Sequence, residues 1–192
     1  MGRDKSLLTY RGVPFLTLIS EEMSKISDDV VVVIGAKDRR GYQGLVRSGV
    51  RVESDAFDVR TPLAGIATGL ELAKHPYAAV VGCDTPLVRR SLLRRLFERA
   101  RDHSAAVPVW RDIGRFEPLV SVYRRSEVAA AAREAIGRGR LGCMQVISSL
   151  QDVVYVDVEE LRGLDVELQS FLNINSEAEY DSLLRRGGGA TG

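Results

Sequence analysis

Short runs of β-branched residues alternate with helical patterns along this chain, and that alternation constrains the fold more than any other feature. The clearest run is at residues 30–34, five consecutive apolar residues that predict a strand buried on both faces of a sheet. Further strands are expected at residues 50–53 and 78–82, with helices between them. Such alternation is typical of an α/β protein with a mostly parallel sheet covered by helices.

The same pattern continues into a more helical second half. Apolar residues at helical spacing follow Pro14, a favoured first residue of a helix, and predict a helix ahead of the first strand. Further helices are expected at residues 42–47, 62–74, 91–101, 126–136, 143–150 and 176–185, and further strands at residues 105–109, 119–123 and 153–158. The short loop around Gly114 predicts that the strands on either side of it pair as a small antiparallel hairpin.

Length, charge and cysteine content narrow the class of protein. The chain has 192 residues, 45% of them hydrophobic, which fits one domain at residues 1–186, followed by a disordered tail at residues 187–192. The 27 basic and 26 acidic residues nearly balance, and no apolar run is close to the about 20 residues that span a bilayer. The isolated Cys83 and Cys143 offer no disulfide framework or metal-ligand pair and are expected to be buried. We therefore expect a cytoplasmic protein with no nucleic-acid or membrane partner.

The strongest candidate for chemistry is the run Gly-Cys-Asp-Thr-Pro at residues 82–86. It follows a predicted strand, and open α/β sheets bind ligands at the carboxyl ends of their strands. Asp84 would place a carboxylate there, and Mg²⁺ in phosphate-handling enzymes often takes only one or two oxygen ligands from the protein. Asp84 is thus a candidate metal ligand; alternatively, its side chain only caps the next turn.

Two further segments could bind a nucleotide. Asp55 follows the second strand, and residues 62–65, Pro-Leu-Ala-Gly, open a helix whose N-terminus could receive an anion. Asp55 could contact a nucleotide sugar or base, or could be a solvated loop carboxylate. Lys5, in the run Gly-Arg-Asp-Lys at residues 2–5, could neutralise charge on phosphoryl oxygens, or could be an exposed lysine near a frayed terminus.

Two other segments carry polar groups that could face a substrate. In the run Phe-Leu-Asn-Ile-Asn at residues 171–175, Asn173 and Asn175 would point the same way, toward a substrate or toward neighbouring loops. Residues 115–119 are either a substrate contact or the entry to a strand.

Together and in this order, these segments resemble the molybdenum cofactor guanylyltransferases, a branch of the nucleotidyltransferase superfamily. The resemblance covers nearly the whole chain, through the runs MGRDKSLL, VESD, PLAGIATGL, GCDTPLV, EPLVSVY and FLNIN. It implies a three-layer Rossmann-like nucleotidyltransferase fold. It also implies transfer of GMP from GTP to the terminal phosphate of molybdopterin, with release of pyrophosphate.

The resemblance also implies roles for the candidate residues. Lys5 would contact the triphosphate, Asp55 the nucleotide and Asp84 the Mg²⁺ cofactor, while Asn173 and Asn175 would lie near the pterin. Because the attacking phosphate oxygen is already anionic, positioning and charge neutralisation by Mg²⁺ and Lys5 would supply most of the acceleration, with Lys5 and Asp84 as the catalytic residues. GTP and molybdopterin would be the substrates, and molybdopterin-synthesis proteins and acceptor molybdoenzymes the protein partners.

One part of the family pattern lies outside this sequence. Members of the family carry a strand and a glycine-rich loop ahead of the segment that resembles MGRDK. That strand would lie between the strands at residues 30–34 and 78–82, and without it backbone groups of both neighbours would lack partners, at about 1–3 kcal/mol each. We therefore expect the natural protein to begin upstream of Met1.

Two other functions remain open at this point. The chain could transfer CMP or another nucleotide, or use a different phosphorylated acceptor, because the residues that select the base would lie largely in the loop outside this sequence. It could instead bind a nucleotide or pterin without turnover, although the presence of Lys5 and Asp84 argues against this.

Overall fold

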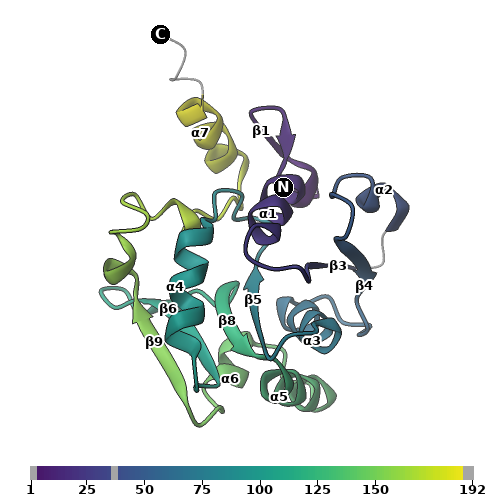
Figure 1. The fold of residues 1–192 in the computed structure, drawn as a ribbon, viewed down its shortest axis with the longest axis vertical. Coiled ribbons are helices and arrows are strands. Elements are labelled where there is room, and N and C mark those ends of the chain that lie inside the picture. Colours follow the sequence, from purple (N-terminus) through teal and green to yellow (C-terminus); the bar gives the residue numbers. More distant parts are fainter. Residues whose placement is uncertain (1–3, 36–38, 188–192) are drawn as a thin grey trace.

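The computed structural model describes residues 4–35 and 39–187, which form an α/β protein with helices on both sides of its strands (Figure 1). The strands are β1 Thr9–Tyr10, β2 Val13–Pro14, β3 Val31–Ile34, β4 Arg51–Ser54, β5 Tyr77–Val81, β6 Ala105–Trp110, β7 Arg115–Phe116, β8 Val120–Arg124 and β9 Val153–Asp157. The α-helices are α1 Phe15–Ser24, α2 Arg39–Gln43, α3 Pro62–Leu72, α4 Arg90–Ala100, α5 Arg125–Gly137, α6 Cys143–Ile147 and α7 Glu177–Gly187, and 3-10 turns lie at Lys5–Leu7, Val158–Leu161 and Gln169–Phe171. Each helix and strand expected from the sequence is present, with its ends shifted by a few residues.

The longer strands form two groups rather than one continuous sheet. β3 and β4 pair in parallel. The larger sheet has the order β5-β8-β6-β7, and β9 pairs with β6 in parallel. β8 is antiparallel to both β5 and β6, so β5, β6 and β9 share one direction and β8 opposes it. The larger sheet is therefore mixed: β8 and the short β7 are antiparallel to the other three strands.

Two short hairpins are built around residues with positive φ. Arg11 and Gly12, with φ of 52° and 78°, make the two-residue turn between β1 and β2. The hairpin predicted around Gly114 is present, but its second arm is the short strand β7. β8 follows β7 and pairs with the beginning of β6, so the two predicted strands are also antiparallel neighbours.

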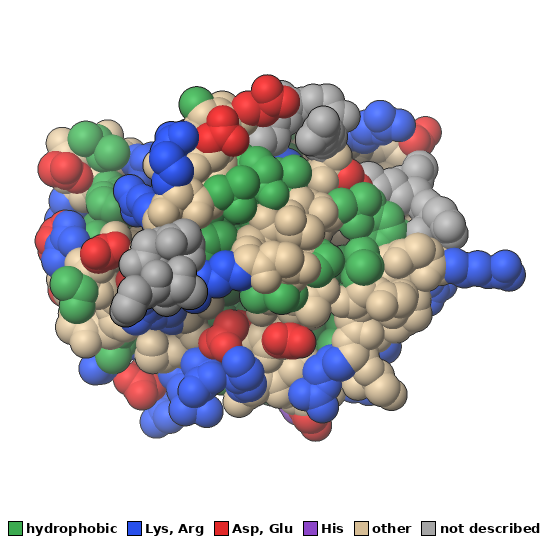
Figure 2. All heavy atoms as spheres, turned by 90° about the horizontal axis from the view of Figure 1, so that it is seen from above, with side chains coloured by type: hydrophobic (Ala, Val, Ile, Leu, Met, Phe, Trp, Pro, Cys, Tyr) green, Lys and Arg blue, Asp and Glu red, His purple; other side chains and the backbone are tan. Residues whose placement is uncertain are grey.

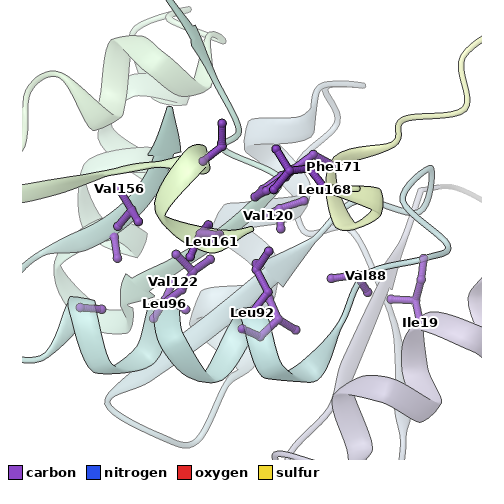
Figure 3. Close-up of a cluster of buried hydrophobic side chains, with 14 residues drawn as sticks. Ile19, Val88, Leu92, Leu96, Val120, Val122, Val156, Leu161, Leu168 and Phe171 are labelled. Carbon is purple, nitrogen blue, oxygen red and sulfur yellow. The ribbon is translucent and has the colours of Figure 1, made fainter. Parts of the chain in front are cut away.

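Different helices cover the two faces of the larger sheet, because alternate side chains of a strand point to opposite faces. α4 packs on one face, where Leu92, Leu96, Val122 and Val156 point toward one another (Figure 3). Helices α3, α5 and α6 cover the other face, with a core that includes Ile66, Leu70, Val107, Tyr123, Val128 and Ile147. The larger sheet thus lies between two helical layers.

The strands β3 and β5 are less buried than the sequence predicts. Residues 31–33 and all five residues of β5 are only half-buried, so the prediction that both strands are buried is wrong at these positions. The reason lies in the pairing. Within the described residues, β3 pairs only with β4 and β5 only with β8, so each has a free edge.

Two predictions fall partly on residues at the chain ends that lie outside the described ranges. Residues 2 and 3 of the N-terminal candidate segment lie outside the described residues. The tail predicted at residues 187–192 also lies outside them, except for Gly187, which ends α7. In the part of the chain that is described, no helix has the length and apolar character needed to cross a membrane.

Candidate active site

The turn after β5 holds Asp84 at the carboxyl end of that strand. The Thr85 N–H and hydroxyl both donate to the Gly82 carbonyl, at 3.3 and 2.9 Å. A Cβ atom at position 82 would lie 2.7 Å from Asp84 Oδ1 and 3.4 Å from Leu119 Cβ. A methyl group at position 82 would therefore force the Asp84 carboxylate to shift, because the turn folds it back against the end of its own strand.

A 3-10 turn that begins at Lys5 brings this lysine to the same place. Asp4 caps the turn, since its Oδ1 accepts hydrogen bonds from the Ser6 N–H at 3.1 Å and from the Ser6 hydroxyl at 2.7 Å. The Tyr42 hydroxyl, on α2, donates to the other oxygen of Asp4. Asp4 thereby fixes the direction in which Lys5 leaves the backbone.

Asn175 arrives from the segment that precedes α7. The Ile174 N–H donates to the Asp84 carbonyl oxygen at 2.9 Å, and the Ile174 side chain is fully buried. Glu179 accepts from the N–H groups of Asn175 and Ser176 at 2.7 and 2.8 Å, while the Ser176 hydroxyl accepts from the Glu179 N–H at 3.2 Å. Ser176 and Glu179 thus form a capping box at the start of α7. The backbone donors lower the pKa of Glu179 below its ordinary value, so the carboxylate stays ionised and holds Asn175 in place.

Three candidate residues from distant parts of the sequence meet at one point. Lys5 Nζ lies 3.4 Å from Asp84 Oδ2 and donates to Asn175 Oδ1 at 2.6 Å. The side chains of Lys5 and Asp84 are 28% and 19% exposed, so a ligand can reach them. β5 points toward the top of Figure 1, and the face seen from above has apolar side chains near its centre and charged ones around them (Figure 2). An ammonium group beside a carboxylate at the end of a strand suits the binding of phosphates.

Asp55 and Asn173 do not join this cluster. Asp55 Oδ1 accepts hydrogen bonds from the Phe57 N–H at 3.1 Å and the Thr68 hydroxyl at 2.7 Å, which ties the loop after β4 to α3. Within the described residues, no hydrogen bond links the Asn173 side chain to the cluster, whereas Asn175 is bonded to Lys5. The contacts of Asp55 with a nucleotide and of Asn173 with a pterin stay predictions.

The segment at residues 115–119 is occupied with internal contacts. Glu117 is buried; its Oε1 accepts from Trp110 Nε1 at 2.8 Å and lies 3.0 Å from Arg115 Nε. The contact with Arg115 is an ion pair, and the Glu117 carbonyl oxygen accepts from the Ser121 hydroxyl at 2.7 Å. These bonds favour the interpretation that the segment is the entry to β8.

The cluster suits a magnesium site that substrate completes. Within the described residues, no three side chains of His, Cys, Asp and Glu gather into a metal site, so Asp84 would act as a single carboxylate ligand. Mg²⁺ commonly takes one or two carboxylates from protein and its other ligands from phosphates and water. Asp84 fits that pattern, because its partly exposed carboxylate already lies beside a cationic group.

Sequence reasoning missed the residues that hold the cluster in place. Glu179 could have been identified, because Ser176 and Glu179 have the spacing of a capping box. Asp4 could not, because nothing in the sequence connects it to Tyr42 in another helix.

The prediction that both cysteines are buried is wrong. Cys83 is exposed, because it lies in the turn that carries Asp84, and Cys143 is half-buried. Partial burial raises the pKa of the Cys143 thiol, which lowers its reactivity.

Comparison with known proteins places this chain in a family. Residues 1–153 match the family described as MobA-like NTP transferase domain. The molybdenum cofactor guanylyltransferase of Desulfosudis oleivorans is 29% identical over 181 residues, which cover 94% of this chain and 85% of that protein. The molybdenum cofactor guanylyltransferase of Pseudomonas entomophila is 31% identical over 152 residues, which cover 76% of this chain and 77% of that protein.

Solved structures share the fold. Molybdopterin-guanine dinucleotide biosynthesis protein A from Archaeoglobus fulgidus matches with a TM-score of 0.79 at 25% identity, covering 96% of this chain and 91% of that one. The 2-C-methyl-D-erythritol 4-phosphate cytidylyltransferase of Thermus thermophilus matches with a TM-score of 0.67 at 18% identity, covering 95% of this chain and 93% of that one. The second similarity concerns the fold alone, and both confirm the predicted nucleotidyltransferase fold.

Proposed function

Because the chain belongs to the MobA-like NTP transferase family, and is thus a nucleotidyltransferase, we propose that it transfers GMP from GTP to the terminal phosphate of molybdopterin. The observation that carries this proposal is the meeting of Lys5, Asp84 and Asn175 at the carboxyl end of β5. The resemblance assigns Lys5 to the triphosphate, Asp84 to the Mg²⁺ and Asn175 to the pterin end, and their proximity supports a single site.

The chemistry requires little from the protein beyond position and charge. An oxygen of the molybdopterin phosphate attacks the α-phosphorus of GTP, and a new P–O bond forms as the bond to the bridging oxygen of the β-phosphate breaks. Pyrophosphate leaves with the electron pair of that bond. The attacking oxygen is already anionic, so no general base is needed, and the Lys5 ammonium would stabilise the charge that develops on the phosphoryl oxygens.

Asp84 would hold Mg²⁺, with the remaining ligands supplied by substrate phosphates and water. When bound, Mg²⁺ neutralises phosphate charge and helps to orient the triphosphate. Asn175 would keep the Lys5 ammonium directed toward the site through their 2.6 Å hydrogen bond. We further propose that the reaction takes place in the cytoplasm, with molybdopterin-synthesis proteins supplying the acceptor and molybdoenzymes receiving the product.

The test follows pyrophosphate release by the purified protein with Mg²⁺, molybdopterin and GTP, CTP or ATP. We expect release with GTP only when molybdopterin is present. Asp84→Asn and Lys5→Ala should each lower the rate by about 100-fold or more, the scale seen when one charge-stabilising group is lost. Lys25→Ala is the matched control, because Lys25 is exposed and paired with Glu22 away from the site.

Three outcomes would change the proposal. Faster release with CTP would make the chain a cytidylyltransferase on the same site. Binding of nucleotides without release of pyrophosphate would favour a carrier without turnover. Full activity of Asp84→Asn would remove Asp84 from the chemistry.

A further inference from the structure

Asp165 is a fully buried carboxylate, and only one of its two oxygens accepts a hydrogen bond from the described residues. Oδ2 accepts from the Ser170 N–H at 2.7 Å. Oδ1 lies 3.4 Å from Arg89 Nε in an ion pair, but no described residue donates a hydrogen bond to it. The Arg89 side chain is 50% exposed, so water screens the attraction between the two charges. Because burial of a carboxylate is costly, such a pair is a poor source of stability, and its contacts point to another role.

The loop between β9 and α7 is folded around Asp165. The Asp165 carbonyl accepts from the Leu168 N–H at 2.9 Å, and the Asp165 N–H donates to the Leu161 carbonyl at 3.1 Å. Leu168 is buried and has a φ of 50°, a left-handed conformation that is unfavourable for a residue with a side chain. This turn directs the Ser170 N–H toward Asp165 Oδ2. Such strain persists only where surrounding contacts require it, so Asp165 and its contacts fix the shape of the loop.

The end of this loop is joined to the segment that carries Asp84 at two points. The Ser170 hydroxyl accepts from the Arg89 N–H at 3.0 Å. The Asp84 carbonyl accepts from the Ile174 N–H at 2.9 Å. Because the residue numbers rise along one segment as they fall along the other, the two segments lie side by side and antiparallel. Asn175 follows the second link immediately.

Asp165 holds both partners of the first link. One oxygen binds the backbone of Ser170, and the other is paired with the side chain of Arg89. Ser170 is fully buried, so its hydroxyl has the Arg89 N–H as a fixed partner. We call Asp165, Ser170 and Arg89 the junction. The junction therefore sets the spacing between two segments, one that carries Asp84 and one that leads to Asn175.

Apolar packing holds the junction against the larger sheet. Leu168 and Phe171 lie beside Val120 in the apolar cluster under α4 (Figure 3). Val120, in β8, pairs with Val81, the last residue of β5. The junction is thus anchored next to the strand end from which the Asp84 turn begins.

We propose that Asp165 is a positioning residue for the reaction, which acts through Ser170 and Arg89. It would set the distance between the Asp84 turn and the segment of Asn175. Transfer of a nucleotidyl group depends on such distances, since a displacement of about 1 Å can lower a rate by about 100-fold. Within the described residues, no hydrogen bond or ion pair connects Asp165 to the side chains of Asp84 or Asn175, so its effect is one of position. The inference rests on the proposed function, which assigns those two residues to the site.

The experiment compares two substitutions that each remove one buried serine hydroxyl. Ser170→Ala breaks the link to the Arg89 N–H and leaves the Asp165 carboxylate in place. Ser104→Ala is the matched control, because the Ser104 hydroxyl is buried and donates to Glu127 Oε1 at 2.6 Å, at the amino end of β6. Since the partner of Ser104 is a charged group, the control should lose at least as much unfolding free energy. Urea denaturation measures that loss.

Steady-state pyrophosphate release separates position from stability. With the nucleotide that supports release by the native chain, we expect kcat of Ser170→Ala to fall at least about tenfold, with KM for that nucleotide within about twofold. Ser104→Ala should keep both constants within about twofold of the native values. Asp165→Asn keeps the size of the side chain but loses the charge that pairs with Arg89, and it should also lower kcat. The two effects should not multiply in the double variant of Asp165→Asn and Ser170→Ala, because both act through the same link.

A second measurement needs no substrate. The Ile174 N–H donates to the Asp84 carbonyl, so its hydrogen exchange, followed by NMR, reports on the contact between the two segments. The Ile174 amide should exchange at least about tenfold faster in Ser170→Ala than in the native chain. Val122, in the centre of β8, is paired with both β5 and β6, and its amide should exchange at the same rate in both proteins.

The results that would overturn the inference differ from those that would overturn the proposed function. Native kcat in Ser170→Ala and Asp165→Asn, in a chain that releases pyrophosphate, would overturn the inference alone. An equal loss of kcat in Ser104→Ala would also overturn it, because the effect would then follow stability. Absence of release from the native chain with any nucleotide would overturn the proposed function, and the Ile174 exchange would then decide the inference. Faster exchange in Ser170→Ala supports control of the Asp84 segment by the junction, and an unchanged rate overturns it.

Discussion

β3, in the small parallel pair, and β6, in the larger sheet, are similarly apolar strands, yet they are buried to different degrees. β3 reads Val-Val-Val-Ile, and its first three residues are half-buried, whereas residues 105–109 of β6 are all buried. β6 is paired on both sides, with β9 on one edge and with β7 and β8 on the other. β3 has one partner. The comparison shows that the burial of a strand depends on its neighbours as much as on its own sequence.

The two regions are also held together differently. The larger sheet is stabilised by packing on both faces, with α4 on one and α3, α5 and α6 on the other. The β3–β4 pair has a small apolar cluster of its own around Leu16, Ile34, Tyr42 and Val52. Its attachment to β5 runs through α1, α3 and the polar contacts of Asp29. In the described part of the chain, helix packing and polar contacts thus connect β3 to β5, rather than backbone hydrogen bonds between the two strands.

The largest effect, on the rate of pyrophosphate release, should follow a substitution of Gly82 in the turn that carries Asp84. Gly82→Ala would place a methyl group 2.7 Å from Asp84 Oδ1, so the carboxylate must shift from its observed position beside Lys5. We expect the rate of pyrophosphate release to fall by about 100-fold. Gly163→Ala, where an added methyl group meets nothing within 4 Å, is the control. If Gly82→Ala keeps the full rate, the observed position of Asp84 does not matter for the reaction.

A matched pair of core substitutions tests the difference in burial directly. Val122→Ala removes two methyl groups from a fully buried side chain in β8, which should lower the free energy of unfolding by about 2 kcal/mol. Val33→Ala removes the same groups from a half-buried side chain in β3 and should lower the free energy of unfolding by less than about 1 kcal/mol. Urea denaturation measures both values. Equal losses would mean that Val33 is as buried in solution as Val122.

Much of this architecture could be predicted from the sequence because its signals are local. The alternation of strand and helix patterns predicted the order of the elements, and Thr61 and Pro62 cap and begin α3 as such residues do. Lys5, Asp84 and Asn175 were also identified separately, each from the residue type and its place after a strand or before a helix.

What could not be predicted depends on distant neighbours. An apolar run such as residues 31–33 looks the same whether one edge or both are paired, so its partial exposure had no signal in the sequence. The insertion of β8 between β5 and β6 likewise depends on the order of strands in the sheet and not on the sequence of β8 itself. Only the structure brings Asp29 to Lys74 and Asp4 to Tyr42, because those contacts join segments with no shared motif.

Hydrogen bonds of Asp29 with Arg51 and with the Lys74 N–H connect the starts of β3, β4 and β5, and we call them the polar brace. Its removal should have a smaller effect, on stability. Arg51→Ala removes both bonds of the Arg51 side chain and leaves the Asp29 carboxylate, which is 4% exposed, with fewer partners. We expect the free energy of unfolding to fall by about 1–2 kcal/mol. Arg133→Ala removes an exposed ion pair with Glu71 and should cost less. Should the two losses prove equal, the brace adds nothing beyond an ordinary surface pair.

The smallest effect concerns the ionisation of Asp29, the carboxylate of the same brace. Burial alone would raise the pKa of Asp29, but hydrogen bonds from the Lys74 N–H and from Arg51 outweigh it and bring the pKa below the ordinary value of 3.8. A carboxyl whose pKa is lower in the folded chain stabilises the fold above its unfolded pKa, and this contribution is lost as the pH falls through the folded value. The difference in unfolding free energy between the native chain and Asp29→Asn should therefore be constant near neutral pH and shrink below 3.8. Urea titrations of both proteins over that range measure it. A difference that persists in acid would show that the charge of Asp29 is not what holds β3 beside β5.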